Sequence, residues 1–130
     1  MKNIMKGTTL AMTLLALTPL ALAREPLRAD QLALLLTGNT LHLAIGTDAK
    51  ATIFFGPDGD VHALLPNGAR DDGKWSLASS DAYCIDWNNG PKKSCTTVVW
   101  NPGKIELRDA AGKPRGVVTR IEPGRDAALQ

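Results

Sequence analysis

YCIDWNNGPKKSCTTVVW, residues 83–100, is the stretch that decides the fold of this chain. Two runs of strand-forming residues flank Asn88–Pro91, four residues that favour turns. If Cys84 lies directly opposite Cys95, the two runs form a β-hairpin in a single register. Since side chains alternate along a strand, one face then carries the two sulfurs. The other face carries an apolar set made of Tyr83, Ile85, Trp87, Thr96, Val98 and Trp100.

The sulfur-bearing face of this hairpin predicts two cross-strand contacts. Asp86 is expected opposite Lys93, as a pair of opposite charges. Cys84 and Cys95 are the only 2 cysteines of the chain, which is too few ligands for a structural metal site. We therefore expect a disulfide between them, which would stabilise the fold by about 2–3 kcal/mol in an oxidising compartment.

Residues 1–23 have the features of a signal peptide. Lys2 and Lys6 form a basic region, residues 8–20 are apolar, and Ala21-Leu22-Ala23 is a small-x-small cleavage site. The apolar run is short for a membrane span, although an uncleaved anchor is the alternative. We expect cleavage after Ala23, a periplasmic or secreted protein, and no membrane span in the mature chain.

Cleavage also changes the charge balance. It would remove Lys2 and Lys6 from the 15 basic residues and leave all 13 acidic residues, so that the mature chain carries no net charge. No basic stripe remains that could neutralise phosphates, which argues against nucleic-acid binding. Residues 24–130 are enough for one domain.

The mature chain begins with one helical pattern and continues with strand patterns. The segment Leu27–Leu36 has leucines at helical spacing, Asp30 as the expected N-cap, and Gly38 at the expected C-terminal stop. Besides the two hairpin strands, six more strands are predicted over residues 40–46, 51–55, 60–65, 74–78, 104–109 and 115–121. Val117, Thr119 and Ile121 are expected to face inward, and the tail after Pro123 is expected to be loose.

Eight short strands joined by tight turns predict an all-β antiparallel meander. Closure into a small lipocalin-like barrel would remove both exposed edges, and a two-sheet β-sandwich is the alternative. The interior of a barrel of about eight strands is just wide enough for side chains or for one small ligand. The rings expected inside should fill most of it and leave no large cavity; they are Phe55, Trp75, Tyr83, Trp87 and Trp100.

The order of turns and aromatic residues resembles a known layout. A leucine-rich helix runs into Gly38-Asn39-Thr40, and Pro57-Asp58-Gly59, Gly73-Lys74-Trp75 and Cys84…Trp87…Cys95 follow. From Leu27 to Pro123 the chain resembles a group of small exported proteobacterial β-proteins. More distantly it is similar to lipocalin-like barrels and to barrel-shaped periplasmic lysozyme inhibitors. The resemblance implies a fold, and it implies no chemistry because likeness of fold does not transfer function.

The residues that most often carry chemistry form no recognisable motif. His42 and His62 are predicted on the outer face of two strands that are not neighbours, too far apart to share a metal. The turn acids match no calcium loop, and the serines lie in no nucleophile motif; the acids are Asp58, Asp60, Asp71 and Asp72. We therefore predict no metal and no cofactor, and we name no catalytic residue.

Three functional hypotheses remain. The first is a small non-catalytic periplasmic binding or protein-interaction domain, such as an inhibitor or an envelope-associated factor. It would contact another periplasmic or extracellular protein through Asn88, Asn89, Lys92 and Lys93. The second is a carrier of a small apolar or aromatic ligand at the barrel mouth, stacked on Trp75, Trp87 or Trp100. The third is an enzyme whose catalytic residues lie on the rim, with His42 or His62 among them.

Overall fold

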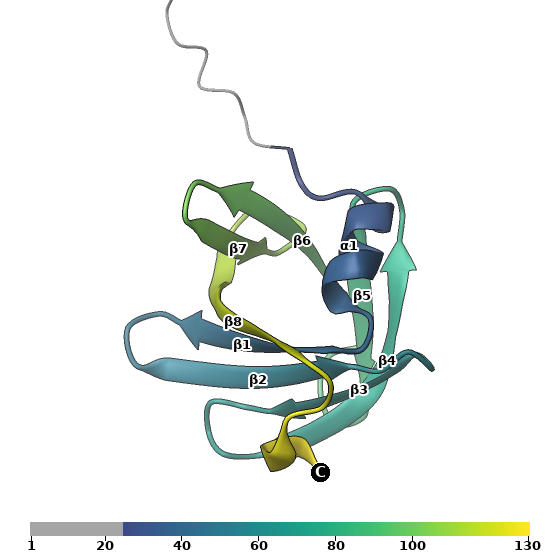
Figure 1. Ribbon diagram of the computed structural model, residues 1–130, viewed down its shortest axis with the longest axis vertical. Helices are drawn as coiled ribbons and strands as arrows, with labels where there is room; N and C mark the ends of the chain where they lie inside the picture. Colours follow the sequence, from purple (N-terminus) through teal and green to yellow (C-terminus); the bar gives the residue numbers. More distant parts are fainter. Residues whose placement is uncertain (1–24) are drawn as a thin grey trace, which may run out of the picture.

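The protein is a closed β-barrel with one short helix (Figure 1). A computed structural model describes residues 25–130, so the expected signal peptide lies outside the described residues. Eight antiparallel strands follow one another around the barrel in chain order, and β8 closes onto β1. This arrangement confirms the predicted barrel and rules out the β-sandwich. Among the described residues, no helix has the length and apolar character needed to cross a membrane.

The elements alternate in direction and are joined by short turns. In chain order they are α1 (Ala29–Leu36), β1 (Asn39–Ile45), β2 (Ala49–Phe55), β3 (Asp60–Leu64), β4 (Arg70–Ala78), β5 (Ala82–Trp87), β6 (Ser94–Asn101), β7 (Lys104–Arg108), β8 (Pro114–Pro123) and the 3₁₀ turn η1 (Ala127–Leu129). Alternate turns therefore lie at the same end of the barrel. We call the end where β1 begins the helix end, because α1 runs directly into β1. The opposite end carries residues 46–48, 65–69, 88–93 and 109–113, and we call it the open end.

The helix packs one face onto the barrel and begins at Ala29, two residues after the predicted start at Leu27. Leu32 and Leu36 are fully buried, and α1 contacts β1, β4 and β5. The N-cap is Arg28 rather than Asp30, and the Arg28 backbone N–H donates to Gln31 Oε1 at 2.9 Å. The Asp30 carboxylate lies in the first turn instead, where its negative charge interacts favourably with the helix dipole.

The core contains most of the rings that were expected inside. Phe55 is fully buried and meets Trp75 and Tyr83 edge to face, with ring centroids 5.4 Å apart in both pairs. Trp100 does not belong to this cluster, because its residue is 59% exposed, so its predicted inward position is wrong. Trp100 lies one residue from the end of β6, opposite Ile105 near the tip of the β6–β7 hairpin, so alternation alone does not bury its ring.

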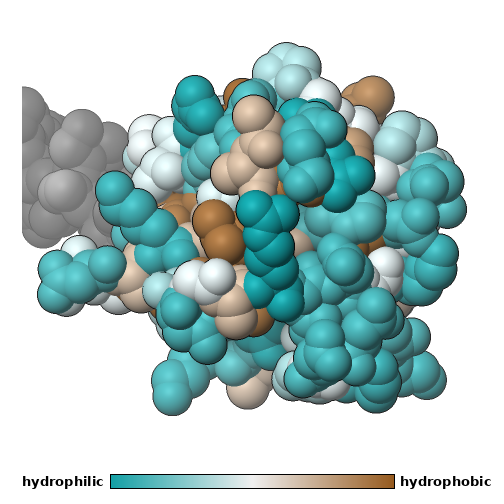
Figure 2. Space-filling model, turned by 90° about the horizontal axis from the view of Figure 1, so that it is seen from below, coloured by the Kyte–Doolittle hydropathy of each residue, from teal (hydrophilic) through white to brown (hydrophobic). Residues whose placement is uncertain are grey.

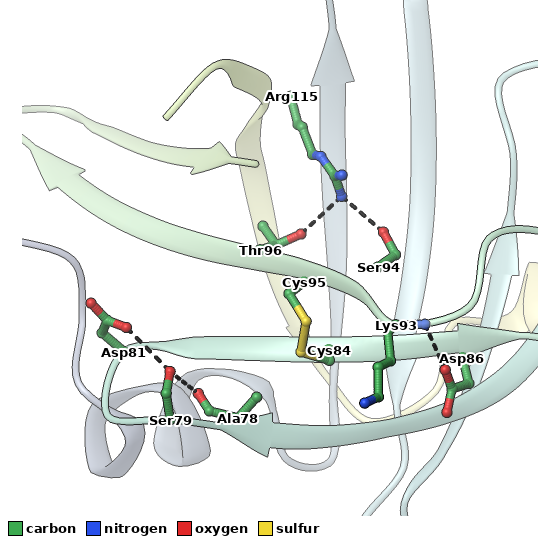
Figure 3. The surroundings of a disulfide bond; sticks show 10 residues. All are labelled: Ala78, Ser79, Asp81, Cys84, Asp86, Lys93, Ser94, Cys95, Thr96 and Arg115. Atoms are coloured by element: carbon green, nitrogen blue, oxygen red, sulfur yellow. Dashed lines mark hydrogen bonds between the residues drawn. A yellow bond between two sulfur atoms is a disulfide. The ribbon is translucent and has the colours of Figure 1, made fainter. Parts of the chain in front are cut away.

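The disulfide-bonded β5–β6 hairpin has the predicted register, and its turn is longer than predicted. Cys84 pairs with Cys95 in the ladder, and the two form a disulfide. The turn covers residues 88–93 rather than four residues. Asp86 and Lys93 form no ion pair; instead, the backbone N–H of Lys93 donates to Asp86 Oδ1 at 2.6 Å (Figure 3). Lys93 has a positive φ of 48°, which turns the chain just before β6 and prevents the direct cross-strand pairing of the two side chains.

Strand β8 departs most from its expected pattern, because it contains two β-bulges. Its pairing with β7 leaves Arg115 without a partner, and its pairing with β1 does the same to Thr119. Each extra residue reverses the alternation. Val118 therefore packs against the core while Thr119 is exposed, and the prediction that Val117 and Thr119 face inward is wrong.

The C-terminal tail is packed, contrary to the expectation that it is loose. Leu129 is buried, and the η1 turn contacts β3. The Asp126 side chain accepts a hydrogen bond from the Ala128 N–H at 2.8 Å and so caps η1. The tail buries an apolar side chain and satisfies its own backbone, and these gains offset the entropy lost on ordering it.

Candidate binding site at the open end of the barrel

A small apolar cavity lies inside the open end of the barrel. Its volume is about 160 Å³, close to that of dry cavities that take up benzene in other proteins. The lining comes from six of the eight strands and from the β3–β4 turn; it consists of Leu43, Ile45, Ala51, Ile53, Leu65, Pro66, Tyr83, Ile85, Trp87, Ser94, Thr96, Leu107, Arg115 and Gly116. The cavity therefore matches an aromatic ring or a short branched chain in size and polarity.

Two of the large core rings, Phe55 and Trp75, lie toward the other end of the barrel, which leaves space at the open end. Phe55 is the last residue of β2 and Trp75 donates from Nε1 to the Gly56 carbonyl oxygen at 2.8 Å, so both lie toward the helix end. At the open end, the small residues Ala51 and Gly116 line the wall. The expectation that no large cavity forms agrees with this volume, but the space that remains is sufficient for a small ligand.

A second hollow adjoins the first and widens the mouth. It has a volume of about 350 Å³ and shares Leu65 and Trp87 with the inner cavity. Its outer wall is the β5–β6 turn, through Asn89, Gly90 and Pro91. The Trp87 side chain thus lines both spaces, whereas Trp75 and Trp100 line neither. Of the three tryptophans considered for ligand stacking, the structure brings only Trp87 to the mouth.

The turn that borders the mouth is held by a buried carboxylate. Asp71 is 5% exposed and accepts hydrogen bonds from the backbone N–H and the side-chain Nδ2 of Asn89, both to Oδ1 at 3.2 Å. Lys92 Nζ donates to the Trp87 carbonyl oxygen. From sequence alone Asp71 is a turn acid, and its contact with Asn89, 18 residues away in the chain, leaves no local signal.

The polar groups of the inner cavity form one small set. Arg115 Nη1 donates to Ser94 Oγ at 2.9 Å and to Thr96 Oγ1 at 3.1 Å (Figure 3). Tyr83 is buried beside them, and burial raises the pKa of its phenol to about 12, against smaller opposing effects of Thr96 and Arg115. At neutral pH this set offers hydroxyl groups and one guanidinium, which can bind and orient a ligand.

The two histidines lie on the outer wall, away from the cavity and from each other. His62 Nδ1 lies 2.6 Å from Asp72 Oδ1, and its ring stacks on Phe54. His42 Nε2 lies 2.8 Å from Glu122 Oε1 and 3.7 Å from Asp126 Oδ2. The structure therefore confirms that the two rings share no site, and it shows that each has a carboxylate partner.

His42, Glu122 and Asp126 form a cluster that the sequence did not reveal. Their ligand atoms lie within 4.8 Å of one another, a spacing that suits a metal ion. However, Arg120 Nη2 lies 2.9 Å from His42 Nε2 and 3.2 Å from Glu122 Oε1. A guanidinium thus already compensates the carboxylates, and a metal ion would have to displace it. The Ala128 N–H, with smaller contributions from its neighbours, lowers the pKa of Asp126.

The remaining turn acids have local structural roles. Asp58 Oδ1 accepts a hydrogen bond from the Asp60 N–H at 3.1 Å. Asp60 forms an ion pair with Lys74 in the opposite strand, and this contact lowers the pKa of Asp60. These contacts account for both acids as parts of the β2–β3 turn.

The cavity and its mouth thus combine an apolar lining, one accessible tryptophan and a small polar set at a single end of the barrel. The histidines and the other acids lie elsewhere. In comparisons with known proteins, this chain matches no family model, no curated protein and no solved structure.

Proposed function

We propose that this protein is a small binding domain that takes a small apolar or aromatic ligand group into the open end of its barrel. The observation that carries this proposal is the 160 Å³ cavity, with its largely apolar lining. Ligand sites are typically concave and mostly apolar, with a few converging polar groups, and this end of the barrel has those features. The disulfide supports a site of action in an oxidising compartment such as the periplasm.

The face of the molecule drawn in Figure 2 shows no large flat apolar surface. Hydrophilic residues dominate the face seen in Figure 2, and hydrophobic residues form only small separate patches there. Large contiguous apolar patches are the usual mark of a flat protein interface. The apolar surface that this proposal uses is inside the barrel mouth.

The chemistry of the cavity supports binding rather than turnover. The residues that line the inner cavity include neither His, Asp nor Glu, and the one carboxylate of the adjoining hollow, that of Asp71, accepts hydrogen bonds from Asn89. A ligand of this size offers few contact atoms, and we expect dissociation constants of about 1 μM to 1 mM.

Filling the cavity tests the proposal. Ala51 lines the cavity and is buried, so Ala51→Leu places extra carbon atoms in the space that the ligand would use. Ala44 lies on the neighbouring strand β1, is only partly buried and does not line the cavity, so Ala44→Leu is the matched control. The measurement is a calorimetric or NMR titration with benzyl alcohol, indole and 1-hexanol. We expect saturable binding in the unmodified protein and in Ala44→Leu, and none in Ala51→Leu.

Two outcomes of this titration contradict the proposal. The first is the absence of saturable binding of every probe to the unmodified protein at millimolar concentrations. The second is equal binding to both variants, provided that circular dichroism shows each to be folded. The second outcome would place the binding site outside the barrel.

Protein interaction through the β5–β6 turn is a second candidate function. The observation that favours it is the fixation of this turn by Asp71 and by the nearby disulfide, which presents Lys92 and Lys93 on an ordered loop. Replacing both lysines by Glu should weaken the capture of a periplasmic partner and leave thermal stability nearly unchanged. Undiminished capture would remove this surface from consideration.

A further inference from the structure

We infer that the ligand of this cavity carries a carboxylate, and that Arg115 is the residue that selects it. This inference deepens the proposed function and depends on it. The ligand class is a small monocarboxylic acid with an aromatic ring or a short apolar chain. Its apolar part would occupy the cavity, and its carboxylate would meet the guanidinium at the mouth.

The backbone places Arg115 at the mouth. The β7–β8 pairing joins Arg108 to Pro114 and Leu107 to Gly116, so Arg115 is the extra residue of a bulge. Bulges are common next to binding sites, where they re-aim a side chain. Here the side chain reaches from β8 to Ser94 and Thr96 on β6, as Figure 3 shows.

The charge of Arg115 is not compensated within residues 25–130. Its only hydrogen-bond partners there are neutral hydroxyl groups, and it forms no ion pair. Arg28, Arg108 and Arg120 each lie within 3.5 Å of a carboxylate oxygen, whereas Arg115, like Arg70 and Arg125, forms no ion pair within the described residues. Arg115 is also the only charged residue among those that line the cavity. Arg115 is exposed at the mouth, and the inner cavity has no negative charge of its own, so a single negative charge on a ligand would complement it.

The guanidinium geometry favours a carboxylate. Both hydrogen bonds of Arg115 use Nη1, so within the described chain Nη2 and Nε remain as donors. A carboxylate accepts two parallel N–H bonds from such an edge, and charge-assisted bonds of this type are stronger than neutral ones. One guanidinium matches one carboxylate in charge, whereas a phosphate group with about two negative charges normally needs more donors.

Matched pairs of ligands test the inference. The probes are phenylacetate with 2-phenylethanol, and hexanoate with 1-hexanol, titrated by calorimetry at pH 7 and low salt. In the unmodified protein each acid should bind at least about tenfold more tightly than its alcohol. Arg115→Gln should bind acid and alcohol equally well, and Arg115→Lys should keep part of the preference.

A matched control distinguishes direct contact between Arg115 and the ligand from the general effect of a nearby positive charge. Lys113 is an exposed cation of the β7–β8 turn that does not line the cavity, and Lys113→Gln should keep the preference for the acid. Because Arg115 occupies a bulge, the fold of its variants is checked by circular dichroism and by the affinity for 1-hexanol, which should be unchanged.

The failures of the two proposals are distinguishable. Equal affinity of the unmodified protein for acid and alcohol would overturn the role of Arg115 and leave the cavity as a ligand site. A preference for the acid that survives Arg115→Gln would likewise overturn that role. No binding of any of the four probes would overturn both proposals.

Discussion

The hydroxyl of Thr40, at the start of the first strand, donates a hydrogen bond to the carbonyl oxygen of Gly124, 84 positions later, at 2.6 Å. The same oxygen of Thr40 accepts from the Asp126 N–H at 3.1 Å. Thr40 is fully buried and both bonds are partly buried, so water competes with them only weakly. One side chain thus fastens the C-terminal tail to the strand that closes the barrel.

Replacing Thr40 by Val should release this tail. The change keeps the shape of the side chain but removes both bonds, and we expect a loss of about 1–3 kcal/mol in the free energy of unfolding. Urea denaturation measures it. Thr52→Val is the matched control, since Thr52 faces outward on β2 and its hydroxyl has no hydrogen-bond partner within the described chain. Equal stabilities of the two variants would show that the tail does not depend on Thr40.

Gly73 should tolerate no larger residue. A Cβ atom at this position would lie 2.2 Å from the Asp86 carbonyl oxygen, which belongs to the backbone of the neighbouring strand. Gly73→Ala must therefore push β4 and β5 apart, and we expect a destabilisation of about 2 kcal/mol or more. Thermal unfolding followed by circular dichroism tests this. Ser76→Ala, at an exposed position on the same strand, should change the melting temperature little.

Reduction of the disulfide should weaken the fold without changing its topology. The Cys84–Cys95 bond closes a short loop whose strands are also joined by the ladder, and we expect a loss of about 2–3 kcal/mol. Chemical denaturation with and without dithiothreitol measures the difference. In a Cys84→Ala/Cys95→Ala double variant, the reductant should have no effect. An unchanged unfolding curve of the unmodified protein under full reduction would contradict the prediction.

Alkaline pH should destabilise the protein through Tyr83. Burial raises the pKa of this phenol to about 12, while in the unfolded chain it is 10.0. Between these values the unfolded state releases the proton and the folded state keeps it. The stabilising contribution is therefore complete below pH 10 and falls by about 1.4 kcal/mol per pH unit up to pH 12.

Tyr83→Phe isolates this effect, because the difference in stability between the two proteins should depend on pH only above pH 10. Tyr83 is the only tyrosine of the chain, so the absorbance of tyrosinate also reports directly on this one group. Titration of the folded protein near pH 10 would contradict the burial of the phenol.

Most of the fold could be predicted from the alternation of side chains along each strand and from the turn residues between strands. The register of Cys84 with Cys95 and the turn at Pro57-Asp58-Gly59 follow from residue types within a few positions of each other. A side chain on a strand faces the same way as its neighbour two positions on, so the order of strands and most of the core could be predicted. Closure of the barrel then follows from the need to pair both edges.

The site could be predicted only in part. Trp87 was among the candidates for ligand stacking, and it does line the cavity, whereas Trp75 and Trp100 were placed with it only because all three share the inward phase. Asn89 was singled out as a surface residue, but its partner Asp71 was not foreseen. A short-range pattern gives the face of a strand and contains no information on which end of the barrel a ring occupies.

By itself, the sequence determined the strands, their order, the disulfide and the helix, because each of these depends on neighbours along the chain. Only the tertiary structure decided where the bulges at Arg115 and Thr119 fall, because a bulge depends on the register of β8 against both β7 and β1. The tertiary structure alone also placed Arg115 beside Thr96 and Thr40 beside Gly124. These contacts join residues far apart in the chain. Only the closing of the barrel brings them together, and no pattern of neighbouring residues encodes that long-range step.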